Sequence, residues 1–288
     1  MQAYLEIVDK ILREGEWKNN RTGIDTLAIA GAMFEHDMSK GFPLLTTKKM
    51  AQETIKVELE GFIKGITDKK WYQERGCKIW NEWCNPQKIP YGTDEESKSK
   101  MKAERDLGTI YGFQWRHWNA DYENFDTDYF GKGIDQLAKI VQTLKKNPND
   151  RRMIVNAWNP EKLSQMALPP CHYGFQVTVI NNKLNLLWNQ RSVDTMLGLP
   201  FNIASYGILL HLLAKESGFE EGKLIGFLGD VHIYENHLEG AKEQLKRTPL
   251  TLPRAETENF SSIFNWEFSD TKFKDYLSHD KINFPIAV

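Results

Sequence analysis

Residues 175–217 decide the fold class, and they read FQVTVINNKLNLLWNQRSVDTMLGLPFNIASYGILLHLLAKES. FQVTVI and KLNLLWNQ are rich in β-branched and aromatic residues, and they flank Asn181-Asn182, a pair that suits a tight turn between neighbouring strands. Residues 201–217 are apolar nearly all round, which predicts a buried helix that ends at Gly218. We therefore expect this sheet and helix to share one core.

Outward from this stretch, the spacing of apolar residues predicts further elements. Residues 4–12, 47–64 and 134–144 predict helices, with a left-handed C-cap at Gly15 and a stop at Asn147-Pro148. MIVNAW at 153–158 and residues 27–38 predict strands, and the polar stretch 92–106 predicts a solvated helix or a mobile insertion. Strands and helices do not alternate, and no repeat or linker divides the chain. We expect a single α+β domain over residues 1–288.

The composition limits the class of partner. The chain has 288 residues and a formal net charge of −2, so its overall charge attracts neither nucleic-acid polymers nor anionic membranes. An anionic ligand therefore requires a local cluster of basic residues. The opening MQAYLEIVDKILREG has acidic residues within its apolar pattern, which argues against a signal peptide or a membrane span. We expect a cytoplasmic protein.

Cys171 is the first candidate for chemistry. It follows two prolines in LPPCH, and these stiffen the backbone that directs its sulfur. Cys77 and Cys84 complete an odd number of cysteines without CxxC spacing, so a disulfide framework is not expected. Taken alone, a cysteine is more often an apolar filler, because reactivity requires a lowered thiol pKa.

Four arginines occur in polar or turn contexts. Arg21 lies in NNRTG, Arg151 and Arg152 lie in NDRR, and Arg191 lies in NQRS. Planar guanidinium groups suit a phosphate, and the same cations would favour a nearby thiolate. Taken alone, any one of them is better explained by a surface ion pair. Together they make Cys171 a candidate nucleophile beside a phosphate site.

Three long motifs carry a resemblance to a known family: LPPCHYGFQ, NQRSVDTMLGLPFNIASYG and GDVHIYENH. The likeness extends over nearly the whole chain through NNRTG, GFPLLTTKK, KIWNEW, TIYGFQWRHW, DRRMIVNAWNP and the ending PIAV. In these motifs the sequence resembles the thymidylate synthases. The resemblance implies a mixed β-sheet packed against helices, and a homodimer formed through the backs of the sheets. Each site would borrow Arg151 and Arg152 from the partner.

For the nucleotide, the resemblance implies a site for dUMP in which Cys171 attacks pyrimidine C6. Asn202 would bind the uracil edge, and Asp194 would contact both the pyrimidine and the folate. The other implied ligands bind the phosphate (Arg21, Arg151, Arg152, Arg191 and Ser192) or the deoxyribose 3′-hydroxyl (His232 and Tyr234).

The implied co-substrate is 5,10-methylenetetrahydrofolate, and its ligands would be Trp80, Asp194, Ala287 and Val288. The family is one of methyltransferases that make dTMP and dihydrofolate, since hydride from the folate reduces the transferred carbon to a methyl group. No metal ion is expected, because the chain has no HExxH or paired-cysteine spacing.

The chemistry explains why these residue types are needed. Uracil C5 is a poor nucleophile until a thiolate adds at C6, which is the role of Cys171. Glu58 and Tyr111 would order the water through which the C5 proton leaves. Trp80 and Leu168 would exclude bulk water. The remaining catalytic candidates that complete the cavity are Asp194 and His172.

Three positions depart from the family pattern on the folate side. Glu60 and Gly61 stand where the family usually has leucine and tryptophan, and Ala51 stands where a histidine is common. An alternative is therefore a dUMP hydroxymethylase, in which water replaces hydride. A further alternative is a non-catalytic nucleotide- or RNA-binding protein. Against it stand the net charge and the intact set of Cys171, Arg191, Asn202 and Tyr234.

Overall fold

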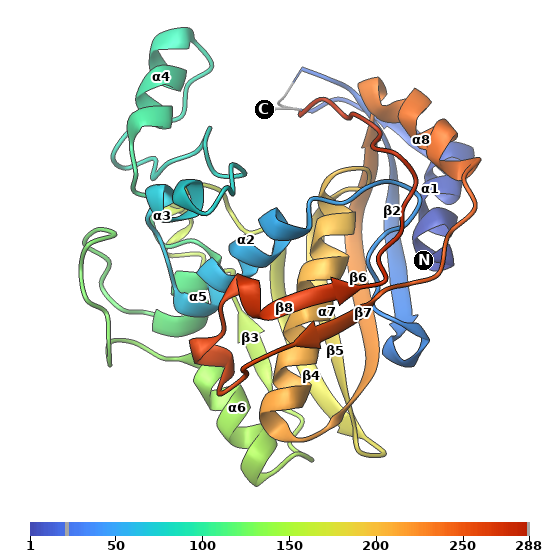
Figure 1. Ribbon diagram of the computed structural model, residues 1–288. Helices are drawn as coiled ribbons and strands as arrows, with labels where there is room; N and C mark the ends of the chain where they lie inside the picture. Colours follow the sequence, from blue (N-terminus) through green and yellow to red (C-terminus); the bar gives the residue numbers. More distant parts are fainter. Residues whose placement is uncertain (21–22, 287–288) are drawn as a thin grey trace. The chain divides into compact units, whose positions relative to one another are not determined.

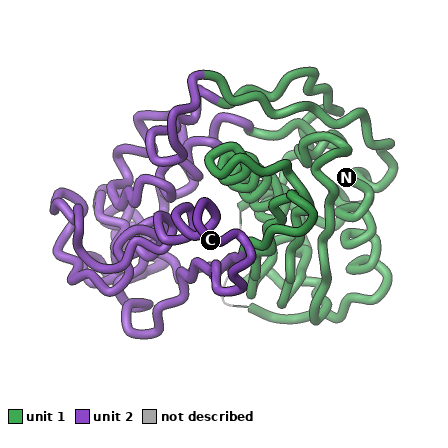
Figure 2. Tube along the Cα trace, turned by 90° about the horizontal axis from the view of Figure 1, so that it is seen from below, with its two compact units in different colours: residues 1–51, 177–258, 271–288 green, residues 52–176, 259–270 purple. Residues whose placement is uncertain are grey.

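The structure is a computed structural model that describes residues 1–20 and 23–286. Three predicted site residues, Arg21, Ala287 and Val288, lie outside the described residues. The chain divides into two compact units (Figure 2). Unit 1 comprises residues 1–51, 177–258 and 271–288, and unit 2 comprises residues 52–176 and 259–270.

The elements follow one another as shown in Figure 1. The α-helices are α1 Gln2–Glu14, α2 Gln52–Lys64, α3 Lys69–Glu74, α4 Glu95–Ala103, α5 Tyr111–His117, α6 Gln136–Lys146, α7 Gly198–Ser217 and α8 Leu238–Leu245. The strands are β1 Glu16–Lys18, β2 Thr26–Asp37, β3 Ile154–Asn156, β4 His172–Ile180, β5 Lys183–Asp194, β6 Glu220–Tyr234, β7 Arg254–Thr257 and β8 Thr271–Lys274. Single 3₁₀ turns are η1 Met38–Lys40, η2 Leu163–Gln165, η3 Glu235–His237, η4 Ile263–Asn265 and η5 Phe268–Asp270.

The strands form one mixed sheet with the order β1-β2-β6-β5-β4-β3, and β7 and β8 form a separate antiparallel pair. β6 is antiparallel to β2 but parallel to β5. The predicted α+β class with a mixed sheet is therefore confirmed. In the described part of the chain, we find no helix with the length and apolar character needed to cross a membrane.

Unit 1 has its core where α7 lies against β5 and β6. The Trp188 ring stacks on Tyr206 of α7, with ring centroids 5.4 Å apart. A side chain at Gly226 would come within 2.4 Å of that indole, so glycine is required there. The predicted turn is confirmed, because Asn181 and Asn182 have φ angles of 50° and 60°. α7 also ends as expected, at a left-handed Gly218 with φ 77°.

Unit 2 has its core where α2 packs against α5. Gly112 permits the close approach of these helices, because a Cβ atom there would lie 2.6 Å from the carbonyl oxygen of Phe62. The Phe62 ring contacts Trp115 of α5 edge to face, and Trp115 in turn contacts Phe175 at the start of β4. This packing fixes the helices that carry the candidate catalytic residues.

Three sequence predictions were wrong in detail. Gly15 is extended, with φ −68° and ψ 147°, because the chain passes directly into β1 and a Cβ atom would lie 2.5 Å from the Ile11 oxygen. The helix predicted from Thr47 begins at Gln52, since the Thr47 hydroxyl accepts a hydrogen bond from Gln244 instead of joining a helical turn. MIVNAW forms only β3, because the Asn156 side chain accepts from the Trp158 N–H and turns the chain.

The charged stretch 92–106 contains α4, which is a solvated helix as predicted. Asp94 caps its first turn by accepting from the Ser97 N–H at 2.9 Å. Within Glu95–Ala103, Met101 alone is buried, and the pairs Lys98–Glu95 and Lys100–Glu96 line the solvent side.

Candidate active site

Cys171 lies at the entrance of β4, directly after Pro169 and Pro170. It is half-buried, and its backbone N–H donates to the Tyr111 hydroxyl oxygen at 2.8 Å. Tyr111 is the first residue of α5, so a side chain from a helix fixes the backbone that presents the thiol. The prolines remove conformational freedom on the other side. The candidate nucleophile is therefore held from both directions.

An aromatic cluster surrounds this hydrogen bond. The Tyr111 ring stacks between His172 and Phe62, with centroid separations of 4.4 and 4.8 Å. Trp80 meets both Phe62 and Tyr111 edge to face, at 6.4 and 6.1 Å. All of these rings except that of Phe62 belong to predicted site residues, and all are buried. Unit 2 thus brings Cys171, Tyr111, His172 and Trp80 together.

Glu58 lies one helical turn before Phe62 on α2 and is 9% exposed. Burial raises the pKa of its carboxyl to about 7, and the indole N–H of Trp80 opposes part of that increase. Among the described residues no acceptor meets full hydrogen-bond geometry with Trp80 Nε1, so the indole N–H acts on Glu58 as a nearby dipole. A carboxyl with this pKa can both take up and release a proton near neutral pH.

The other ionisable groups in unit 2 have simpler behaviour. Burial lowers the pKa of His172 to about 3, so its ring is neutral at physiological pH. Burial raises the pKa of Cys77 to about 12 and that of Cys84 to about 11, which keeps both as unreactive thiols. In the described part of the chain no cysteine forms a disulfide. Cys171 is thus the most accessible of the three thiols.

Unit 1 holds Asn202 in one orientation. Its Oδ1 accepts from Gln190 Nε2 at 3.0 Å, and Gln190 Oε1 accepts from the Trp188 indole at 3.1 Å. Because an indole nitrogen only donates, it fixes the Gln190 amide, which in turn fixes that of Asn202. Asn202 is 9% exposed on α7. This chain of hydrogen bonds fixes which side of the Asn202 amide donates and which side accepts.

The ends of β5 and β6 carry four more predicted residues. Asp194 lies directly opposite His232 in the parallel register, and its Oδ1 accepts from the backbone N–H groups of Met196 and Leu197. His232 Nδ1 lies 2.9 Å from Asp230 Oδ1, and its ring contacts Tyr234. Burial acts to raise the pKa of Asp230, but hydrogen bonds from Lys18 and His232 outweigh it and leave that pKa lowered. Ser192 is half-buried on β5.

The three described arginines of the predicted phosphate site occupy exposed positions. Arg191 is exposed on β5, whereas Arg151 and Arg152 lie in the turn that precedes β3 in unit 2. Arg152 donates two hydrogen bonds to Asp150, at 3.0 and 2.9 Å, and its side chain is 88% exposed. An exposed pair of this kind contributes little to stability, so the guanidinium can exchange its partner for another anion at small cost.

Two residues contribute to these groups although the sequence assigned them no role. Gln190 orients Asn202, as described above. His237, fully buried, lies at 4.0 Å from Asp194 and contacts the carbonyl oxygen of Pro285 through Nε2 at 2.6 Å. It therefore lies between Asp194 and the C-terminal segment, and its hydrogen bond is to that segment. Its place in GDVHIYENH was the available signal, but only the tertiary contacts reveal its partners.

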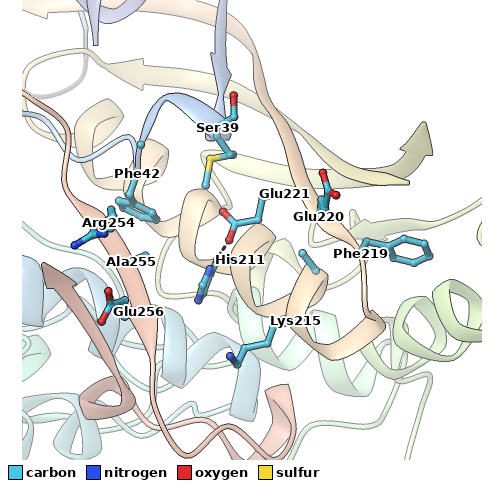
Figure 3. Close-up of a pocket in the computed structure, with 13 residues that line it drawn as sticks. Ser39, Phe42, His211, Lys215, Phe219, Glu220, Glu221, Arg254, Ala255 and Glu256 are labelled. Carbon is cyan, nitrogen blue, oxygen red and sulfur yellow. Dashed lines mark hydrogen bonds and ion pairs between the residues drawn. The ribbon is translucent and has the colours of Figure 1, made fainter. Parts of the chain in front are cut away.

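Unit 1 also has a cavity of about 570 Å³ that contains none of the predicted site residues. In it, His211 of α7 contacts Glu221 Oε1 at 2.6 Å (Figure 3). The other ring nitrogen of His211 contacts Thr257 Oγ1 at 2.9 Å. The Thr257 hydroxyl continues to Thr271 at 2.7 Å. These contacts tie α7 to the β7-β8 pair, which is a structural role.

Comparison with known proteins decides the family. The family model described as thymidylate synthase matches residues 2–288. The chain belongs to the thymidylate synthase family. It is 42% identical over 307 aligned residues to a thymidylate synthase of Mycoplasma mobile, with both chains covered completely. It is 43% identical to a bifunctional dihydrofolate reductase-thymidylate synthase of Paramecium tetraurelia over 99% of this chain, which spans 61% of that longer protein.

The structure gives a physical account of two departures from the family pattern. A Cβ atom at Gly61 would lie 2.3 Å from the Tyr72 ring, so Tyr72 of α3 occupies the space beside α2 at that position. The Glu60 side chain is buried, but it pairs with Lys64 at 2.5 Å and accepts from the Phe268 N–H at 2.9 Å. Both unusual residues therefore have packed or hydrogen-bonded partners. Ala51 is exposed, and nothing in the structure explains its identity.

Proposed function

We propose that the protein converts dUMP and 5,10-methylenetetrahydrofolate to dTMP and dihydrofolate, through a covalent bond between Cys171 and pyrimidine C6. The observation that carries the proposal is the hydrogen bond from the Cys171 N–H to the Tyr111 hydroxyl oxygen, in a chain that belongs to the thymidylate synthase family over residues 2–288. The chain holds this cysteine in a fixed place and keeps Cys77 and Cys84 as thiols.

Each neighbour of Cys171 has a definite part in the proposed reaction. Attack of the thiolate at C6 makes C5 an enolate carbon, and the folate supplies the one-carbon unit and the hydride. Glu58, with a pKa of about 7, orders with Tyr111 the water through which the C5 proton leaves, and its carboxyl takes up that proton and returns it to solvent. Neutral His172 and the ring of Phe62 hold Tyr111 in place from both faces.

Trp80 fits the folate side of this proposal. Its ring is 3% exposed, and its indole Nε1 has no partner at full hydrogen-bond geometry among the described residues. A buried donor in this state is unfavourable unless a ligand or an ordered water satisfies it. Together with Glu58, it supplies polar groups within an otherwise apolar wall. The hydride must reach the exocyclic carbon before water does, and this wall serves that purpose.

Product analysis tests the function. The protein is incubated with dUMP and methylenetetrahydrofolate, the nucleotide is weighed by mass spectrometry, and dihydrofolate is followed by its absorbance. We expect dTMP and dihydrofolate in equal amounts. Hydroxymethyl-dUMP with tetrahydrofolate would instead identify a hydroxymethylase, and an unchanged nucleotide would refute both activities.

We also propose that the protein works as a homodimer formed through the outer face of the sheet. In unit 1, large apolar side chains are exposed on neighbouring strands, including Met33 at 57% and Phe227 at 45%, which are directly paired in the β2–β6 register. Trp17 and Ile180 are also more than half exposed. In unit 2, Ile154 and Tyr173 are exposed on β3 and β4. A second copy of the sheet would cover such residues.

Mixing two inactive subunits tests the donation of arginines across this dimer. Cys171→Ser removes the nucleophile, and Arg151→Glu repels the phosphate. A heterodimer of the two has one site of two with both native elements, so we expect each heterodimer to show up to half the activity of a wild-type dimer. The measurement is turnover after subunit exchange, with heterodimers verified by mass. Verified heterodimers without activity would place Arg151 and Cys171 in the same subunit's site.

Base discrimination tests the role of Asn202. In uracil, O4 accepts and N3–H donates, and cytosine reverses both, so a fixed amide favours uracil. Asn202→Asp should lower kcat/KM for dUMP and raise the relative use of dCMP, by a mispairing cost on the order of 1 to 3 kcal/mol. The Gln190–Asn202 hydrogen bond supports this fixed orientation. If the ratio of kcat/KM for the two nucleotides is the same in both proteins, Asn202 does not read the base.

A further inference from the structure

Lys69, the first residue of α3, is 1% exposed, which is unusual for a lysine. Its ammonium group donates to three backbone carbonyl oxygens: those of Asn81 at 3.3 Å, Trp83 at 2.9 Å and Met101 at 2.7 Å. An ammonium has three protons to donate, and here all three have acceptors. These three hydrogen bonds of the buried ammonium group therefore all go to main-chain oxygens.

These oxygens come from two segments that are distant in sequence. Asn81 and Trp83 belong to the turn that carries Trp80, and Met101 belongs to α4 of the charged stretch 92–106. The turn is held within itself by hydrogen bonds from Asn81 N–H to Lys78 and from Trp83 N–H to Trp80, both 3.1 Å. Residues 77–83 belong to no helix or strand. Lys69 thus adds a buried tertiary connection to two exposed ones, in which Gln73 donates to Asn81 Oδ1 at 3.0 Å and Lys102 pairs with Glu82 at 3.5 Å.

A second connection joins α3 to the end of the same stretch. The Lys69 N–H donates to the Arg105 carbonyl oxygen at 2.8 Å, and the Arg105 guanidinium pairs with Asp68, which caps α3. α4 itself is anchored by the buried Met101 side chain. Both the stretch 92–106 and the Trp80 turn are therefore hydrogen-bonded to Lys69 at the start of α3.

We propose that Lys69 is a positioning residue, which ties the turn that presents Trp80 to the charged stretch 92–106 and thereby sets the position of the wall on the folate side. The inference rests on the proposed function, in which Trp80 forms that wall. Trp80 meets Phe62 and Tyr111 edge to face, and such contacts depend on ring tilt. Its Nε1 has no hydrogen-bond partner among the described residues that could hold the ring instead.

The test compares Lys69→Met with Lys70→Met. Lys70 is the next residue, but it is exposed and pairs only loosely with Glu74, at 3.7 Å, so it controls for charge loss in α3. For Lys69→Met we expect unchanged dUMP affinity, a loss on the order of tenfold in kcat/KM for methylenetetrahydrofolate, and a larger fraction of hydroxymethyl product. Lys69→Arg should recover part of the loss, and Lys70→Met should match the wild type.

Two further measurements make each outcome decisive. Met101→Ala keeps Lys69 but loosens α4, so it should impair the folate step in the same direction as Lys69→Met. This variant provides the test if Lys69→Met does not fold. Hydrogen exchange of residues 79–84 should be faster in either variant, whether or not the wild type is active. Folded variants with wild-type folate kinetics and unchanged product would overturn the proposal, as would unchanged exchange. A wild-type protein without activity would instead refute the proposed function. The hydrogen-exchange rates of residues 79–84 would then be the test of whether Lys69 holds the Trp80 turn.

Discussion

Cys171→Ser should reduce turnover by on the order of 10³-fold or more while leaving dUMP affinity nearly unchanged, because a serine hydroxyl is a far weaker nucleophile than a thiolate at neutral pH. The backbone hydrogen bond from residue 171 to the Tyr111 hydroxyl oxygen does not involve the sulfur, so the substitution should keep the local geometry. The measurements are kcat with both substrates, and dUMP affinity by calorimetry.

Cys84→Ser is the matched control, since that thiol is buried and its pKa is raised to about 11. It should retain most of the wild-type turnover. If Cys171→Ser retained turnover within about tenfold of the wild type, covalent catalysis by this residue would be excluded.

Glu58→Gln should lower kcat by on the order of 10²- to 10³-fold, because glutamine cannot accept the proton that leaves C5. The pKa of Glu58, about 7, places its protonation change within the working range of pH. The wild-type pH profile should therefore contain a step near neutrality that is missing from the mutant. Glu60→Gln, a change in a buried neighbouring carboxyl held by Lys64 and Phe268, should leave that step in place.

Glu58→Gln should raise the free energy of unfolding although it lowers kcat. Burial raises the pKa of Glu58 from its ordinary 4.5 to about 7, so the folded state binds the proton more tightly than the unfolded state. The free energy of unfolding of the wild type therefore falls as pH rises through this range, and the full penalty is present above the folded pKa. Glu58→Gln should be more stable than the wild type at pH 8, by on the order of 3 kcal/mol, but not at pH 4. Equal gains at both values would show that ionisation of Glu58 is not the cause.

The sequence predicted the elements whose pattern is local. Two strands around Asn181-Asn182 and the buried helix ending at Gly218 were found as expected, because apolar periodicity and positive φ angles depend on neighbouring residues. The errors at Gly15 and Thr47 have one physical reason: in each case a partner distant in sequence determines the backbone. Leu27 restricts the space at Gly15, and Gln244 holds Thr47. The spacing of apolar residues along the sequence carries no information about such tertiary contacts.

The candidate site followed from motifs, and the structure adds how its residues are held. Motifs drew attention to Cys171, Tyr111 and Asn202, but the contacts between Tyr111 and the Cys171 backbone, and between Gln190 and Asn202, are tertiary. Arg21, Ala287 and Val288 stay predictions, as they lie outside the described residues. From the sequence alone, Lys69 cannot be distinguished from a solvated lysine, because the backbone oxygens that accept from its ammonium group belong to residues 81, 83 and 101.

Detection of the covalent intermediate tests the central claim most directly. The reaction is quenched in acid during turnover, the protein is digested, and the peptides that contain Cys77, Cys84 and Cys171 are weighed. We expect added nucleotide mass on the Cys171 peptide alone, present only while both substrates are being consumed, because the other two thiols have pKa values raised to about 12 and about 11. Turnover to dTMP with the adduct on another cysteine would contradict the assignment of Cys171 as the nucleophile.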